Sequence, residues 1–259
     1  MVLSGPEINA LVGSWLWPLF RVGGMVMTAP VFGTRSVPPR VRLMLALAIT
    51  LVVAPLLPPG PQLPLGSPLM LFLLAQQVLI GVLMGFAVQL VFAAVITGGH
   101  TVAMQMGLGF SMMVDPQNGQ QAPVLSQFYV LMIILVYLAL NGHLVLIEVL
   151  VDSFRTLPIG PSGLQAESFR QVVGWGSHIF AGGLALALPA VASLLLVNLA
   201  FGIMTRAAPQ LNLFAIGFPV TMMIGFALVL ITLPGVIPQA GSLFNQIFHL
   251  LTRILGGGG

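Results

Sequence analysis

The sequence predicts an all-α integral membrane protein with about six long, partly kinked hydrophobic helices arranged in hairpins. Apolar residues make up 58% of the 259 residues and charged residues only 5%, whereas a soluble domain carries roughly a quarter charged residues. The ranges 43–114, 171–205 and 207–252 contain no charged side chain. Each is longer than the ~20 apolar residues that cross a hydrocarbon core.

The same composition excludes several classes of function. All eight basic residues are Arg, and the net charge is only +3. Nucleic-acid binding requires a dense basic face, for which Arg35, Arg40 and Arg42 are too few, so no nucleic-acid partner is expected. The absence of Cys excludes disulfides, thiol catalysis and thiolate metal sites. The first residues lack the basic region and cleavage pattern of a removable signal peptide.

The first hydrophobic segment is predicted over Ile8–Ala29, with Pro18 and Arg21 inside it. A charge at membrane depth costs about 2.5–3.5 kcal/mol unless it is paired or reaches water. We interpret Arg21 as a structural residue that reaches the membrane surface or a neighbouring subunit. A place beside a conduit is the alternative.

A linker from Pro30 to Arg42 follows, and its three Arg residues favour an anchor at the lipid headgroups over a partner-binding face. The second segment, Val41–Leu57, ends at a proline-rich loop. The third, Leu69–Gly98, contains Gly81 and Gly85 at the spacing that lets helix backbones approach closely. We interpret this pair as ordinary helix packing.

The next elements are predicted from further glycines, prolines and charges. A break is expected at Gly98-Gly99-His100, before a fourth helix over Val124–Val149 that contains Asn141-Gly142-His143. Glu148 and Asp152 lie one helical turn apart near Arg155, which favours an ion cluster at the helix end over an acid–base pair. The range Arg155–Gly176 is predicted to be a loop in water or at the membrane interface.

The C-terminal part is predicted to hold two more apolar segments and a final helix. Ser177–Met204 is expected to break at Pro189, and Arg206–Asn212 to form a tight polar turn. Leu213–Leu233 is expected to kink or end at Pro219. The predicted amphipathic helix at the end covers Gln239–Leu255.

The stretch Ala103–Leu125 is the one around which the chain is organised, and in it methionines and glycines are followed by a run of polar residues. Glycines loosen a helix, and buried amides need partners, so this stretch suits an irregular segment that lines a passage. Methionine side chains adapt easily to variable neighbours. The competing interpretation is that the methionines only fill a core.

No enzymatic site is predicted. The four His residues lack metal-site spacing, the acids are scattered, and no nucleotide-binding motif occurs, so no metal or cofactor is expected. Ser111 with His143 or His178 faintly resembles an intramembrane serine protease, but Met112 stands where such enzymes place Gly. A small-solute transporter with broken helices is the main alternative class, with Asp115 as its coupling acid.

Four stretches carry a resemblance to a known family, in the family's order and over nearly the whole chain. They are Phe20–Gly33 continuing through Val37–Val41, Gln105–Gln117, Asn141–His143 with Ser153, Phe154 and Pro158, and Arg206–Pro219. They resemble the FliR/SctT family of export-gate subunits in type III secretion systems, and the flagellar branch looks closer.

The resemblance implies a non-enzymatic subunit of the flagellar protein export gate, in the bacterial inner membrane at the flagellar basal body. It implies assembly with FliP-like and FliQ-like subunits, with FlhB-like and FlhA-like proteins as further partners. Exported flagellar proteins would pass through, and membrane lipid would surround the gate. The chain would resemble a fusion of a FliP-like part, about 1–175, and a FliQ-like part, about 176–259.

The family match also implies roles for particular residues. The expected pore plug consists of Met104, Gln105, Met106, Gly107, Gly109, Phe110, Met112, Met113, Asp115, Pro116, Gln117 and Asn118. Subunit packing or polar contacts are expected from Arg21, Arg206, Pro209, Gln210 and Asn212. In this hypothesis the methionines form a compliant seal, the glycines let the backbone bend, and the amides bond to neighbouring subunits.

Overall fold

The computed structural model describes residues 5–34, 36–64, 66–109, 124–161, 163–207 and 217–256, with side chains from residue 13 onward. These residues form eight α-helices and one short 3-10 helix, with no strand among them. The all-α prediction is confirmed for this part of the chain. The number of helices exceeds the expected six because the predicted boundaries are partly wrong.

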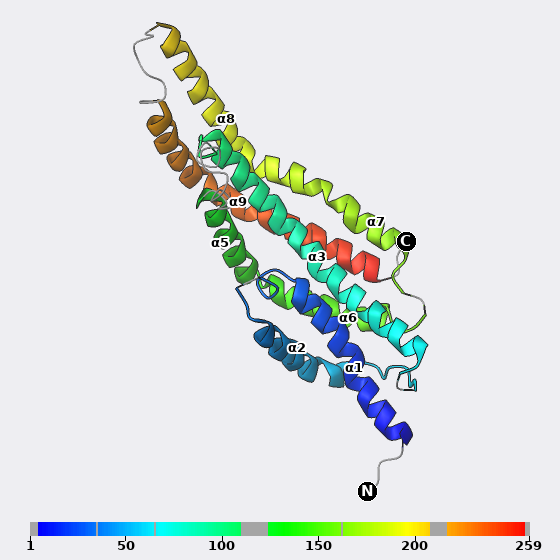
Figure 1. Ribbon diagram of the computed structural model, residues 1–259. Coiled ribbons are helices and arrows are strands. Elements are labelled where there is room, and N and C mark those ends of the chain that lie inside the picture. The colour runs from blue at the N-terminus through cyan, green and yellow to red at the C-terminus, as the bar shows by residue number, and fades with distance from the viewer. Residues whose placement is uncertain are drawn as a thin grey trace. The chain divides into compact units, whose positions relative to one another are not determined.

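The first two predicted segments are confirmed as α1 (Gly5–Thr28) and α2 (Pro39–Val53), with the 3-10 turn η1 (Ala54–Leu56) after α2 (Figure 1). Pro39 lies in the first turn of α2, where the missing N–H would have no partner within the helix anyway. A non-helical residue, Leu57, follows η1 and leads into the proline-rich loop.

The long helix α3 (Pro68–Gln105) runs through the predicted break at Gly98-Gly99-His100, so that prediction is wrong. The two glycines serve packing instead. A Cβ atom on Gly98 would lie 2.8 Å from the Gly183 carbonyl oxygen of α8 (Ser177–Ala207), and one on Gly99 would lie 2.7 Å from the ring of Tyr129 in α5 (Val124–Ala139). Absent side chains therefore let α5 and α8 approach α3 closely.

The predicted fourth helix is in fact two helices, α5 and α6 (Gly142–Thr156). Asn141 separates them in the left-handed conformation, with φ of 55°. Its carbonyl oxygen accepts the backbone N–H groups of Leu144 at 2.8 Å and Val145 at 3.1 Å. Asn tolerates this conformation better than most residues, so the motif Asn141-Gly142 starts a new helix.

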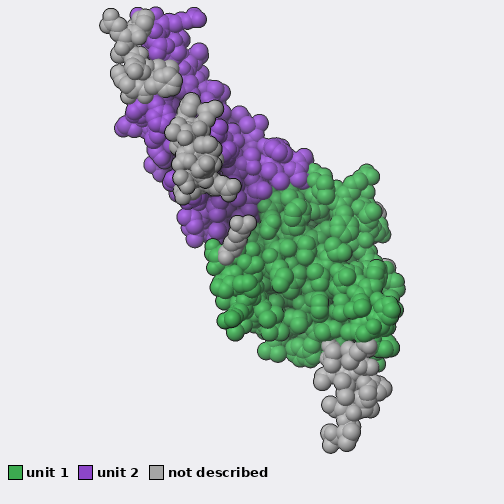
Figure 2. All heavy atoms as spheres, in the orientation of Figure 1, with its two compact units in different colours: residues 1–90, 141–175, 244–259 green, residues 91–140, 176–243 purple. Residues whose placement is uncertain are grey.

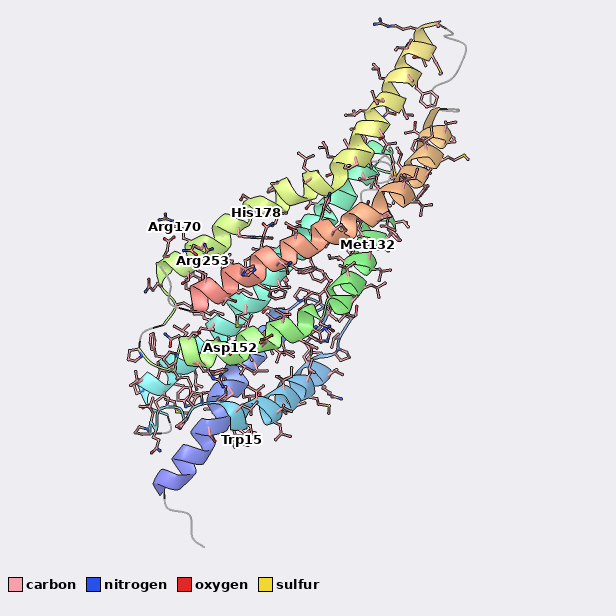
Figure 3. All side chains as sticks on the ribbon, turned by 180° about the vertical axis from the view of Figure 1, so that it is seen from behind. Trp15, Met132, Asp152, Arg170, His178 and Arg253 are labelled. Atoms are coloured by element: carbon pink, nitrogen blue, oxygen red, sulfur yellow. The ribbon has the colours of Figure 1, made fainter. Side chains whose placement is uncertain are left out.

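A short amphipathic helix, α7 (Ala166–Trp175), lies inside the range predicted as a loop. Its buried residues are Ser168, Val172 and Trp175, while Glu167 and Arg170 on the other face form an ion pair at 3.6 Å. Figure 3 shows Arg170 pointing away from the helix. Prolines and glycines flank this short helix, and for this reason the sequence predicts a loop here.

The prolines of the C-terminal part do not break the helices as predicted. Pro189 lies within α8, and Pro234 and Pro238 lie within α9 (Phe218–Leu255). A proline removes only one backbone hydrogen bond, and apolar helices tolerate this loss when neighbouring groups compensate. Pro219 lies in the first turn of α9, which continues beyond it. The predicted final helix Gln239–Leu255 is the second half of α9.

The chain forms two compact units that alternate along the sequence (Figure 2). Unit 1 comprises residues 1–90, 141–175 and 244–259, and unit 2 comprises residues 91–140 and 176–243. In unit 1, Trp17, Met70 and Leu73 form a buried cluster. In unit 2, the rings of Phe92 and Tyr137 meet edge to face at 5.6 Å. The expected FliP-like and FliQ-like division stays a prediction.

Four helical stretches of the described residues are long and apolar enough to cross a membrane: Pro39–Leu56, Pro68–Gln105, Ala166–Ala207 and Phe218–Leu255. The pair α5 and α6 would make a fifth if it acts as one broken span. The prediction of an all-α membrane protein is therefore confirmed. Among the described residues, fewer segments could span a membrane than there are helices.

Candidate functional site

The described part of the predicted plug is the C-terminal end of α3, within unit 2. Gly107 has a φ of 83° and donates its N–H to the carbonyl oxygen of Met104 at 3.0 Å, while Leu108 donates to Ala103 at 3.1 Å. These two bonds form a Schellman motif, which ends a helix with a glycine in the left-handed conformation. Gly107 therefore lets the backbone turn at the end of α3, while its part in a plug stays a prediction.

The two methionines at this helix end have different surroundings. Met106 is fully buried, and a Cβ atom on Gly225 of α9 would lie 2.6 Å from its Cγ atom. Met104 is 52% exposed, and a Cβ atom on Gly109 would collide with its sulfur. Core filling, one of the two interpretations of the methionines, therefore describes Met106, whereas Met104 remains available to a passage.

The other predicted plug residues lie outside the described residues. They are Phe110, Met112, Met113, Asp115, Pro116, Gln117 and Asn118. Gln105 is the last residue of α3 and is partly exposed. The assignment of a plug to this segment stays a prediction.

A second site surrounds Arg21 in unit 1, where the side chain is completely buried. Its Nε and Nη2 atoms both donate to the side-chain oxygen of Gln77 in α3, at 2.8 and 2.5 Å. Nη1 donates to the Ser153 hydroxyl at 2.9 Å and Nη2 to the Leu157 carbonyl at 3.1 Å. The guanidinium therefore reaches neutral acceptors on two other segments of the chain, and it does not extend to the surface.

The same guanidinium stacks on the ring of Phe154, 4.0 Å from the ring centre. Such cation–π contacts gain strength when they are removed from water. Leu157 is the C-cap residue of α6, and a positive charge near a helix C-terminus also interacts favourably with the helix dipole. Arg21 thus links α1, α3 and the end of α6.

Close contact between α1 and α3 brings Arg21 to Gln77. A Cβ atom on Gly24 would lie 2.5 Å from the Val78 carbonyl oxygen, and one on Gly85 would lie 2.6 Å from the Ala29 backbone nitrogen. A Cβ atom on Gly81 would collide with the Arg21 carbonyl oxygen. The interpretation of Gly81 and Gly85 as helix-packing residues is confirmed.

Gln77 is the functional residue that sequence reasoning missed. The adjacent pair Gln76-Gln77 inside a charge-free apolar run was the available signal. Gln76, with its amide oriented to satisfy both neighbours, donates to the Gly160 carbonyl oxygen and accepts from the Gly163 N–H, both at 3.0 Å. Gln76 therefore holds the segment that follows α6 against α3, whereas Gln77 holds Arg21 of α1.

The remaining predicted residues have simpler surroundings. Arg206 is exposed in the last turn of α8, and Pro209, Gln210 and Asn212 lie outside the described residues. Glu148, Asp152 and Arg155 are exposed on α6, with Asp152 labelled in Figure 3. No ion pair joins these three side chains in the described structure, so the predicted ion cluster is wrong. No group of three or more potential metal ligands occurs among the described residues.

Comparisons with known proteins agree with this architecture. Residues 12–247 match the family model of bacterial export proteins, family 1. The flagellar biosynthetic protein FliR of Escherichia coli is 46% identical over 93% of this chain and 94% of its own length. The FliR proteins of Pectobacterium carotovorum and Bacillus subtilis are 41% and 27% identical. They cover 94% and 96% of this chain, and 93% and 97% of their own lengths. The chain therefore belongs to the FliR family of bacterial export proteins.

Proposed function

We propose that the chain is a non-enzymatic subunit of the flagellar type III export gate, which forms and seals the channel for unfolded flagellar proteins. A role in flagellar export follows from the family and from the names of the relatives. Membership of an export family leaves the small-solute transporter without support.

The end of α3 is the observation that carries the gate assignment. The helix is largely buried along its length, yet it ends in a glycine-dependent turn directly beside the exposed Met104. The next residues combine glycines, methionines and amides. A flexible apolar side chain beside a sharp backbone turn suits a seal that must close tightly and yet open for varied cargo.

In this proposal the chain lies in the bacterial inner membrane at the flagellar basal body. FliP-like and FliQ-like subunits would pack against it, and FlhB-like and FlhA-like proteins would complete the apparatus. Large apolar side chains are exposed on α8 and α9, including Leu196, Leu199, Met223 and Ile231. Such surfaces suit burial by neighbouring helices or lipid.

A deletion of residues 107–121 tests the seal. We expect the variant to co-purify with FliP-like and FliQ-like subunits as the unaltered chain does, while ions leak across the membrane of cells that produce it. Unchanged ion permeability in a correctly assembled complex would contradict the plug assignment. A chain that is stable alone or as a homo-oligomer, and binds neither subunit type, would contradict the gate itself.

Contact with cargo can be tested at two neighbouring positions. A photoreactive amino acid at Met104, which is half exposed, should crosslink to a flagellar substrate stalled in export. The same amino acid at the buried Met106 is the matched control and should give little product. Equal crosslinking at both positions, or none at Met104, would argue against a passage at the end of α3.

A further inference from the structure

Beyond Arg40 and Arg42 in its first turn, helix α2 has an outer face without a polar side chain. Its inner face buries Ala46, Thr50 and Val53, and the Thr50 hydroxyl donates to the Ala46 carbonyl oxygen at 2.7 Å. The large residues of the outer face, together with Leu56 of η1, are all exposed to between 47% and 69%: Val41, Leu43, Met44, Leu47, Leu51, Val52 and Leu56. An apolar surface of this extent requires an apolar neighbour outside the chain.

Two arginines at the start of α2 have opposite surroundings. Arg42 turns back toward the preceding linker, where its Nε donates to the Val37 carbonyl oxygen at 3.0 Å and its Nη2 to the Thr34 carbonyl oxygen at 2.6 Å. Arg40 is exposed and has no hydrogen-bond or ion-pair partner among the described residues. Its charge also lies at the positive end of the helix dipole, which disfavours a cation there. Arg40 is therefore available to an anion from outside the chain.

The residue types of the outer face favour lipid over another protein helix. Helices that pack together within membranes place small residues in their contact, as Gly24 and Gly81 do between α1 and α3. Between Val41 and Leu56, the outer face of α2 offers large, mostly branched side chains and only Ala48 as a small exposed residue in its helical part. Such a surface suits mobile acyl chains.

The length of α2 together with η1 is consistent with contact with lipid. The stretch Pro39–Leu56 contains 18 residues, which corresponds to about 27 Å of helix against a hydrocarbon thickness of about 30 Å. Arg40 lies at one end of the apolar stretch, at the depth where phospholipid headgroups begin. An anionic headgroup there would complement the charge that the chain leaves unpaired.

We propose that the outer face of α2 contacts the acyl chains of the bilayer directly and that Arg40 binds the headgroup of an anionic phospholipid. Arg42 instead binds the two carbonyl oxygens of the preceding linker and holds this linker against the start of α2. This inference does not depend on the gate function, because it concerns the surroundings of α2 alone.

The cysteine-free sequence allows a direct test with single labels. The full chain carrying Met44→Cys is purified from cells that produce the whole flagellar export apparatus, labelled with bimane and placed in lipid nanodiscs. Lipids brominated in their acyl chains should strongly quench a label at position 44. A label on Asp152→Cys, an exposed polar position of α6, is the comparison and should be quenched less. Absence of quenching at position 44 in the assembled complex, together with quenching in the isolated chain, would show that a protein covers α2 and would overturn the proposal.

The headgroup is tested with brominated phosphatidylglycerol and brominated phosphatidylcholine at equal fractions. At position 44 we expect the anionic lipid to quench more than the zwitterionic one. Arg40→Gln should abolish this difference, whereas Arg253→Gln, which removes the same charge elsewhere, should preserve it. Arg42→Gln should preserve the lipid preference and lower the thermal unfolding midpoint, because it frees two carbonyl oxygens. Equal quenching by both lipids in the unaltered chain, or an unchanged preference in Arg40→Gln, would overturn the role of Arg40.

Discussion

Arg21 and Gln77 meet at a single acceptor atom, because two guanidinium nitrogens donate to the one side-chain oxygen of Gln77. The amide nitrogen of Gln77 is buried beside them and has no hydrogen-bond partner among the described residues. The site therefore uses only one of the two polar atoms that Gln77 brings to it. A carboxylate would present two acceptors to the same pair of donors.

This geometry predicts different outcomes for two substitutions of Gln77. Gln77→Glu should keep or raise the thermal unfolding midpoint, since it exchanges an unpaired donor for a second acceptor next to a cation. Gln77→Leu should lower the stability by about 3 kcal/mol, because it leaves a buried charge without two of its hydrogen bonds. The midpoint of the purified chain in detergent measures both effects.

The exposed Gln239 of α9 provides the control for these two variants. Gln239→Glu and Gln239→Leu should each change the stability by no more than about 0.5 kcal/mol. A Gln77→Leu variant as stable as Gln239→Leu would mean that the contacts of Arg21 contribute little.

Two adjacent glycines of α1 predict opposite effects of the same substitution. Gly24→Ala should destabilise the chain by about 1–3 kcal/mol, because the new methyl group would meet the backbone of Val78 and Val82, which cannot shift independently. A methyl group on Gly23 would have no neighbour within 4 Å. Gly23→Ala should therefore raise the stability slightly through helix propensity. Similar unfolding midpoints for the two variants would contradict the close approach of α1 and α3.

The separation of α5 from α6 predicts a penalty for removing Asn141. Asn141→Ala should cost about 1 kcal/mol, because alanine resists the left-handed conformation. Asn198 is an exposed residue of α8 in ordinary helical geometry, so Asn198→Ala should be neutral or slightly stabilising. Urea denaturation of both variants, followed by circular dichroism, measures the difference. A stabilising Asn141→Ala would indicate a continuous helix across this position.

Gly107 predicts a functional effect at the end of α3. Gly107→Ala should strain the Schellman motif by about 1–2 kcal/mol and misdirect the segment that follows. We expect reduced swimming motility and increased ion leakage from an assembled complex. Gly202→Ala changes a glycine of α8 with open space around it and should leave both readouts unchanged. Normal motility with Gly107→Ala would show that the gate does not require this turn.

The sequence predicts the apolar helices well but not their interruptions. Long charge-free runs identify α2 and α3 because burial in lipid leaves a compositional pattern. The positions of glycines do not predict in the same way whether a helix continues or ends. Gly98 and Gly99 continue a helix because Gly183 and Tyr129 pack on them, whereas Gly107 ends the same helix, and this difference depends on distant partners.

The surroundings of Arg21 also depend on residues that are distant in the sequence. Arg21 is recognisable in the sequence as a costly charge, but its acceptor Gln77 and the ring of Phe154 are brought to it only by the packing of α3 and α6. The plug rests on a family resemblance, and its described part, from Met104 to Gly109, supports only the turn that begins it. Proline positions alone do not predict where these helices end. Pro189 lies within α8, and Pro219 lies in the first turn of α9.

The partners of Arg21 are made long after Arg21 itself. Gln77 follows 56 residues later, and Ser153 and Leu157 follow 132 and 136 residues later. At a synthesis rate of about 5–20 residues per second, Arg21 is made roughly 7–26 seconds before Ser153. Gln77 is made within roughly 3–11 seconds of Arg21 at the same rate, so for the rest of the interval the guanidinium lacks only its two acceptors at the end of α6. The helix that is synthesised first therefore completes its contacts only after α6 has been synthesised.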